Sequence, residues 1–197
     1  MSSKEWYELI LSSLLKEPDQ DVLLPCRAEL LHPGNDWQKT WSVARLKGLS
    51  SDSISFFWQM LHGLLPTRDR LHRILPTVAN ATCLECDEQD SLKHALAECP
   101  ATRPVFDWML NALGQFDSSL TADKMLLLNI EQDHILPYCH LPLVWFIAEV
   151  WRRVWKLRRD NKQCHLFRIR AEIESEINTV RRSRYRDMAV ILDLMVQ

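Results

Sequence analysis

The sequence predicts a mostly α-helical protein, a bundle of short helices with a small zinc knuckle of three cysteines and one histidine. Only four of its 197 residues are glycine, and such a low count disfavours tight-turned β architectures. Apolar residues recur at helical spacing in several segments bounded by capping residues or proline. Three of the six cysteines fall within one short stretch. Together these observations indicate helices joined by short loops around a metal site.

The N-terminal part predicts one amphipathic helix followed by a connector. Apolar residues recur at helical spacing from Ser3 to Lys16, and Pro18 follows as a stop. Residues 18–36 contain three prolines and a glycine without a sustained period, which is typical of a loop. A short helix is then expected to begin at Asp36.

A helical hairpin is predicted next. Hydroxyl and carboxylate side chains from Ser50 onward can cap a helix that ends at Gly63. Thr67 can cap a second helix, which Pro76 terminates. We expect Leu71, Ile74 and Leu75 to form the buried face of this second helix, so that the two helices pack as a compact pair.

Four further helical regions follow the cysteine-rich stretch. Helices are expected over Arg103–Leu113, where Gly114 is a stop, and over Leu120–Ile130. A longer helix is predicted over Leu141–Arg159, and a last helical region over Gln163–Met195 with a break near Arg182–Tyr185. The chain is accordingly divided into residues 1–36, 37–116 and 117–197.

The segment from Cys83 to Cys99 has the spacing C-x2-C-x7-H-x4-C, formed by Cys83, Cys86, His94 and Cys99. Two cysteines three positions apart can direct their sulfurs to one point, and Asp90 or Ser91 can cap a short helix that presents the histidine. Three sulfurs and one imidazole nitrogen fill all four positions of a tetrahedral zinc ion, which leaves none for a catalytic water. The pattern therefore predicts one structural Zn2+.

Other interpretations of these residues remain open. The cysteines can be buried free thiols beside an ordinary core histidine, or Cys83 and Cys86 alone can form a thiol-disulfide redox pair. No strand-then-helix pattern typical of thioredoxins surrounds that pair. The remaining cysteines and histidines form no comparable set, although two Cys-His dipeptides, at Cys139 and Cys164, can reach a metal through tertiary proximity.

Charge is segregated along the chain although the net charge is only −2. Residues 151–186 contain 12 Lys and Arg against 4 Asp and Glu. A basic helix face that also carries tryptophan is typical of proteins that bind nucleic-acid phosphates. The candidate contacts are Arg152, Arg153, Lys156, Arg158 and Arg159. A solvated face that balances the acidic N-terminal part is an equally suitable explanation.

Composition also bounds the class of protein. No stretch reaches the roughly 20 apolar residues that span a membrane, and the N-terminus lacks a leader pattern. We therefore expect an intracellular protein, in the nucleus or cytoplasm, with reduced thiols and no membrane partner. We expect no small-molecule substrate and no enzymatic activity, because pairs such as Asp133-His134 are isolated and build no titratable cluster.

Three features follow one another along the chain in a specific order. They are the two tryptophans of Trp37-x3-Trp41, the run from Phe56 to Leu71 with its Leu-Pro-Thr corner, and the Cys-x2-Cys-x7-His-x4-Cys-Pro motif. In this order they resemble the zinc-binding region downstream of the reverse transcriptase in LINE-type (non-LTR) retrotransposons. The resemblance covers roughly Trp37 to Trp108. It implies that the three cysteines and the histidine are zinc ligands and that the region helps to hold RNA or DNA beside a reverse transcriptase core.

The resemblance does not imply polymerase activity, because the chain has no Tyr-x-Asp-Asp signature. Two functional hypotheses follow. The first is a non-catalytic nucleic-acid-binding module that is part of, or derived from, such an element. The second is a zinc-stabilised protein-interaction or structural domain without nucleic-acid binding. Phosphate binding weakens steeply with salt, whereas an apolar protein interface does not, so salt dependence separates the two.

Overall fold

The computed structural model describes residues 37–77, 80–128, 130 and 137–196. Within these residues the chain forms nine helical segments and no strand beyond two isolated β-bridges, which confirms the predicted mostly helical fold. The predicted helix over 3–16 and the connector after it lie outside the described residues. No helix among the described residues is both long and apolar enough to cross a membrane.

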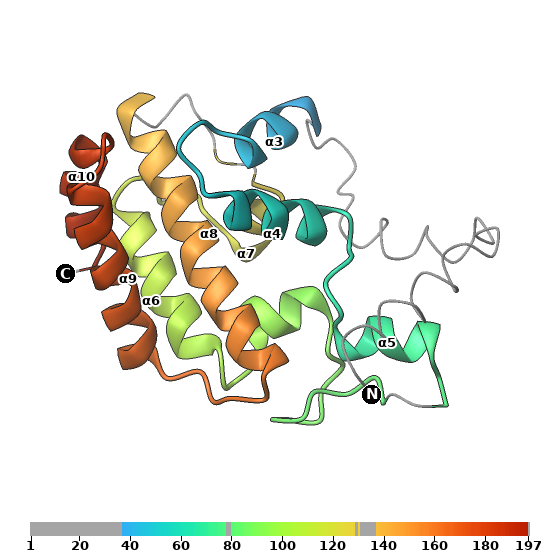
Figure 1. The fold of residues 1–197 in the computed structure, drawn as a ribbon. Coiled ribbons are helices and arrows are strands. Elements are labelled where there is room, and N and C mark those ends of the chain that lie inside the picture. The colour runs from blue at the N-terminus through green and yellow to red at the C-terminus, as the bar shows by residue number, and fades with distance from the viewer. Residues whose placement is uncertain (1–36, 78–79, 129, 131–136, 197) are drawn as a thin grey trace.

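The helices form a bundle around one long central helix (Figure 1). In chain order they are α3 (Trp37–Ala44), α4 (Ser51–Leu61), α5 (Arg68–Ile74), the π-helix η1 (His94–Glu98), α6 (Arg103–Gly114), α7 (Ala122–Leu126), α8 (Pro137–Arg159), α9 (Leu166–Arg181) and α10 (Arg186–Val196).

Helix α8 is central because its first half is apolar on every side. Residues 143–151 of α8 are all buried, and α4, α6, η1, α9 and α10 pack around the helix. A helix that is apolar all round is typical of a protein interior, whereas amphipathic helices lie at its surface. From Arg152 onward α8 carries its arginines and its lysine, interleaved with the buried residues Arg153, Val154 and Leu157.

Local capping chemistry sets several helix boundaries as predicted. Ser50 caps α4 by accepting a hydrogen bond from the Ser53 N–H, and Thr67 caps α5 by accepting one from the Arg70 N–H. Gly63 follows α4 with φ +63°, in the left-handed region that favours glycine. The predicted break in the last helical region is also present, between α9 and α10.

Helices α4 and α5 do not form the predicted compact hairpin. Figure 1 shows α5 set apart from α4, on the far side of the Leu-Pro-Thr corner. Leu71, Ile74 and Leu75 are only half-buried, while the buried residue of α5 is Asp69. Asp69 accepts a hydrogen bond from Gln89. Because its contacts are polar, α5 lies against the cysteine-rich segment rather than against α4.

Two helices differ in length from the prediction. Helix α7 spans five residues rather than 120–130, and it ends before Leu128, which has φ +51° and is fully buried. Helix α8 begins four residues earlier than predicted, and Pro142 lies inside it. The carbonyl that Pro142 deprives of a partner belongs to Tyr138, which is exposed in the first turn. Solvent can therefore satisfy that carbonyl.

Candidate metal centre

The four predicted ligand residues converge on one point. One ligand atom from each of Cys83, Cys86, His94 and Cys99 lies within 4.8 Å of the others. The sulfurs of Cys83 and Cys99 are 3.7 Å apart, and the Cys86 sulfur lies 3.3 Å from Nε2 of His94. A tetrahedral zinc ion with bonds of about 2.3 Å to sulfur and 2.0 Å to nitrogen needs edges of about 3.8 and 3.5 Å. The two shortest-range pairs are therefore close to the edges of a zinc tetrahedron.

Two local structures bring the ligands together. Cys83 and Cys86 lie on a knuckle closed by the Cys83 N–H donating to the Glu88 carbonyl at 2.7 Å and the Asp87 N–H donating to the Cys83 carbonyl at 3.0 Å. His94 opens η1 and Cys99 directly follows it, with the Cys99 N–H donating to the His94 carbonyl. This π-type hydrogen bond spans five residues and is often found at functional sites.

The ligands are shielded to different degrees. Cys83, Cys99 and His94 are buried, whereas Cys86 is partly exposed. Ser91 accepts a hydrogen bond from the His94 N–H at 3.1 Å, which confirms one of the two predicted caps of this helix. Within the part of the chain that the structure describes, no second group of three metal-binding side chains gathers. Cys139 and Cys164 lie outside this cluster.

The other predicted cap, Asp90, has a different role. Its side chain is almost fully buried, and Oδ1 accepts a hydrogen bond from Nη2 of Arg158 at 2.5 Å. Its Oδ2 accepts one from the backbone N–H of Arg68 at 2.9 Å. The same Nη2 of Arg158 lies 3.5 Å from the Cys83 sulfur. A residue 75 positions downstream thus contacts both the knuckle and one of the candidate ligands.

These contacts control the ionisation of the cysteines. Burial alone would raise the pKa of Cys83, but hydrogen bonds from Arg158 and the Glu85 N–H lower it to about 6. Burial, together with the nearby thiolates of Cys83 and Cys99, raises the pKa of Cys86 to about 11. Thiolates this close repel one another. The donor set therefore suits a divalent ion, which removes this repulsion.

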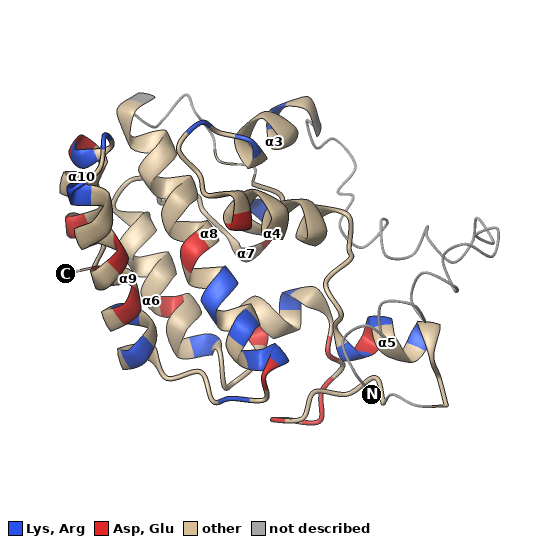
Figure 2. Ribbon diagram, viewed as in Figure 1, with Lys and Arg blue, Asp and Glu red and all other residues tan. Residues whose placement is uncertain are grey.

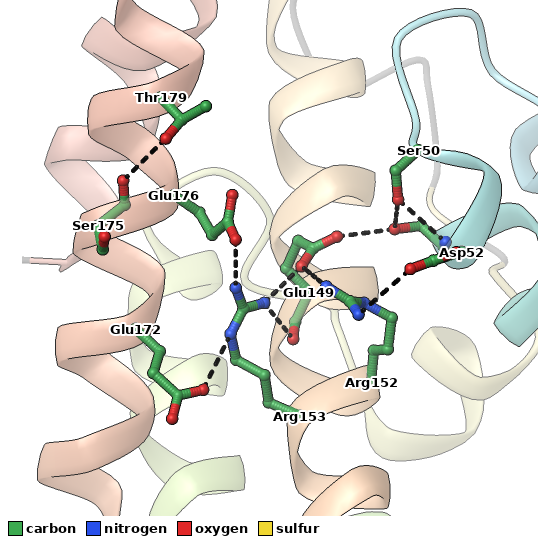
Figure 3. Close-up of polar contacts among 10 residues, drawn as sticks. Ser50, Asp52, Glu149, Arg152, Arg153, Glu172, Ser175, Glu176 and Thr179 are labelled. Carbon is green, nitrogen blue, oxygen red and sulfur yellow. Dashed lines mark hydrogen bonds and ion pairs between the residues drawn. The ribbon is translucent and has the colours of Figure 1, made fainter.

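The structure also places the five predicted nucleic-acid contacts, all on the second half of α8. Arg153 is 8% exposed and points toward α9, where it pairs with Glu172 at 3.5 Å and Glu176 at 3.3 Å (Figure 3). It also donates to Glu149 of α8 itself. Arg152 donates to the same Glu149 at 2.7 Å and faces Asp52 of α4.

The remaining three lie near the end of α8. Arg158 is held by Asp90, and Arg159 pairs with Asp160 at 3.2 Å. Lys156 and Arg159 are exposed. Figure 2 shows blue segments on these last turns of α8 and on α5 nearby. Of the five candidates, Lys156 and Arg159 are therefore the most accessible, and both lie on the last two turns of α8.

Sequence reasoning did not single out Glu149, which is buried and organises the polar contacts of Figure 3. It accepts hydrogen bonds from Arg152, Arg153 and the Ser53 hydroxyl. Glu149 precedes Arg152 by three residues and Arg153 by four, and opposite charges at these spacings lie side by side on a helix. That spacing was a usable signal for these pairs, whereas nothing in the sequence indicated Ser53.

Comparison with known proteins finds a similarity over part of the chain. Residues 28–106 match the family model described as zinc-binding in reverse transcriptase. No curated protein and no solved structure matches the chain. The matched segment contains all four residues of the cluster and ends within α6. By this match and by the donor set that it encloses, residues 28–106 are similar to the zinc-binding domains of reverse transcriptases.

Proposed function

We propose that this chain is a non-catalytic module in which Cys83, Cys86, His94 and Cys99 hold one structural zinc ion. The observation that carries the proposal is the convergence of these four donor atoms within 4.8 Å. Three thiolates and one imidazole fill the shell of the ion, so it has no open position for a reacting water. The metal's contribution is then to stabilise the knuckle, by about 10 kcal/mol or more at neutral pH.

We further propose that the module binds single-stranded or duplex nucleic acid as part of, or as a descendant of, a non-LTR retrotransposon reverse transcriptase protein. The family match supports the association with a reverse transcriptase. The exposed Lys156 and Arg159 on the last two turns of α8 support contact with phosphates. Of the five basic residues predicted for this role, these two are the most accessible.

A second candidate function is a zinc-stabilised structural or protein-interaction domain. The observation that favours it is the internal pairing of the arginines. Arg152, Arg153, Arg158 and Arg159 each have a carboxylate partner within the chain. A guanidinium so engaged has fewer donors left for a phosphate.

Metal content tests the first proposal. The full chain, purified without chelator, should contain one zinc per molecule, and a Cys83→Ser/Cys99→Ser variant should lose both the metal and part of its helical circular dichroism. Cys164→Ser is the matched control, because this cysteine lies outside the cluster. A folded wild-type chain without metal would contradict the zinc proposal.

Titration of RNA and DNA oligonucleotides at several salt concentrations separates the two functions. A nucleic-acid-binding module should lose affinity steeply as salt rises, with a slope of about −0.7 per phosphate contact for single strands. A structural or protein-interaction domain should show no saturable binding at any salt concentration. Zinc-loaded protein is used in every titration so that a folding defect does not imitate a binding defect.

A further inference from the structure

The feature that carries a further inference is a groove beside the metal cluster. It has a volume of about 630 Å³ and lies between α5, the knuckle and the end of α8. Four cations and two carboxylates line it, so its charge is positive. The side chains that matter below are Arg68, Leu71, Leu84, Trp155, Arg159 and Lys162. Its size falls in the range that takes a small-molecule-sized group such as one nucleotide.

The groove combines an apolar floor with a cationic edge. Trp155 and Leu71 are partly buried in it, and Leu84, between the two knuckle cysteines, is 63% exposed. The side chains of Arg159 and Lys162 are more than half exposed at the end of α8. This arrangement of an aromatic ring and neighbouring cations is the one that holds bases by stacking and the backbone by charge.

The remaining charges of the groove support the same ligand. Arg158 engages the carboxylate of Asp90, which therefore does not repel an incoming anion. Buried Nε of Arg68 has no hydrogen-bond partner among the described residues, which is an unmet donor beside the groove. Asp160 pairs with Arg159 and Lys162, and it is the carboxylate that a phosphate must displace.

We propose that this groove binds one unpaired nucleotide of a single-stranded nucleic acid. The base packs against Trp155 and Leu71, and the adjoining phosphates contact Arg159 and Lys162. This inference rests on the proposed nucleic-acid binding. It adds where the nucleic acid binds and that the bound nucleotide is unpaired. Because the knuckle forms one side of the groove, zinc acts on binding by fixing Leu84 and the backbone around it.

The test uses the zinc-loaded full chain and fluorescent oligouridine and oligothymidine of about ten nucleotides, a length within the usual site size. Arg159→Glu/Lys162→Glu is compared with Arg182→Glu/Arg186→Glu, which makes the same change of charge on exposed residues outside the groove. Trp155→Leu is compared with Trp58→Leu, because Trp58 is exposed on α4 and does not line the groove.

Arg159→Glu/Lys162→Glu should bind at least tenfold more weakly at moderate salt, and it should reduce the salt slope by about 1.4, or two phosphate contacts. Trp155→Leu should lose about 5- to 150-fold in affinity, the range for one stacked base. The control variants should bind as the wild type does. Zinc content and circular dichroism are measured for each variant. If Trp155→Leu does not fold, the exposed charge variants still decide the matter.

The outcomes separate this inference from the proposed function. Wild-type binding that the groove variants leave unchanged would refute the groove and leave nucleic-acid binding standing at another surface. Absence of any wild-type binding would refute both. Displacement of the oligonucleotide by polyglutamate at the same charge concentration would also refute the nucleotide site, because it would show that charge alone is recognised.

Discussion

The contact between Arg158 and the metal cluster gives the sharpest prediction about the zinc site. Three thiolates, one neutral imidazole and Zn2+ carry a net charge of −1 together, and Arg158 is the cation that touches this group through the Cys83 sulfur. Outer contacts of this kind typically change metal affinity 10- to 100-fold when they are removed. We expect Arg158→Met to weaken zinc binding by this factor, which corresponds to about 1.4–2.8 kcal/mol.

The same substitution should lower stability by a separate route. Asp90 is 4% exposed, and without Arg158 its carboxylate keeps the backbone N–H of Arg68 as its hydrogen-bond donor. An uncompensated buried charge of this kind costs about 3 kcal/mol. Adding Asp90→Asn to the Arg158→Met chain removes that charge. The double variant should regain much of the stability in urea unfolding but not the zinc affinity.

Competition with a chelator of known affinity measures the zinc affinity of each variant. Arg159→Met is the matched control, since its side chain is 59% exposed and pairs only with its neighbour Asp160 among the described residues. A value for Arg158→Met within twofold of the wild type would refute the reasoning. If the double variant regained zinc affinity as fully as stability, the two effects of Arg158 on metal affinity and on stability would not be separate.

Arg158 should also set the pH at which zinc is released. Its hydrogen bond opposes burial and lowers the pKa of Cys83 to about 6, so the thiolate that binds the metal persists down to that pH. Without Arg158 the pKa of Cys83 rises, protons compete with zinc at higher pH, and the midpoint of zinc release should move to higher pH. A midpoint that does not move would mean that Arg158 has no influence on the thiolate.

The remaining predictions concern the bundle and its dependence on the rest of the chain. Glu149→Ala should destabilise the protein by about 3 kcal/mol in urea unfolding, since it leaves buried Arg153 without its closest partner, whereas Glu172→Ala should cost less than about 1 kcal/mol. Burial, then the charge of Lys39, lowers the pKa of His140. The unfolded chain therefore takes up a proton below about pH 6.5 that the folded chain does not. Stability should fall as the pH decreases from 7 to 5.5, by up to about 1.4 kcal/mol per pH unit, and His140→Leu should flatten this slope. A fragment of residues 28–106 should bind zinc at least tenfold more weakly than the full chain in the same chelator competition, and equal affinity would show that α8 has no effect on the site.

The parts of the structure that sequence reasoning anticipated are those decided by neighbours along the chain. The spacing of the three cysteines and His94 limits where their donor atoms can go, and the hydroxyls of Ser50 and Thr67 satisfy N–H groups three residues ahead. Both are short-range effects with few alternatives. The break between α9 and α10 is of the same kind.

The parts that it did not anticipate depend on how distant elements pack. A run of arginines shows that a segment is basic, but the partners of Arg153 on α9 exist only after α8 and α9 lie side by side. One hydrogen-bond donor to the Asp90 carboxylate is likewise Arg158, 68 positions away. Helix α5 was expected to pack on α4 by its apolar residues, and polar contacts with the knuckle placed it elsewhere. Charge counted along the sequence therefore overestimates the charge available at the surface.

The segment that matches the family model is shorter than the set of elements that pack around the metal cluster. The match ends at residue 106, yet η1, which carries His94, packs on both α6 and α8. The guanidinium that contacts Cys83 also comes from α8, beyond the matched segment. Since a ligand that binds only the folded state stabilises everything that folds with its site, zinc bound at the knuckle stabilises the attachment of α8 as well. Conversely, the packing of α8 holds Arg158 in place before the metal arrives. The zinc site and the C-terminal helices thus form one thermodynamic unit, although the family motif occupies only the segment before α8.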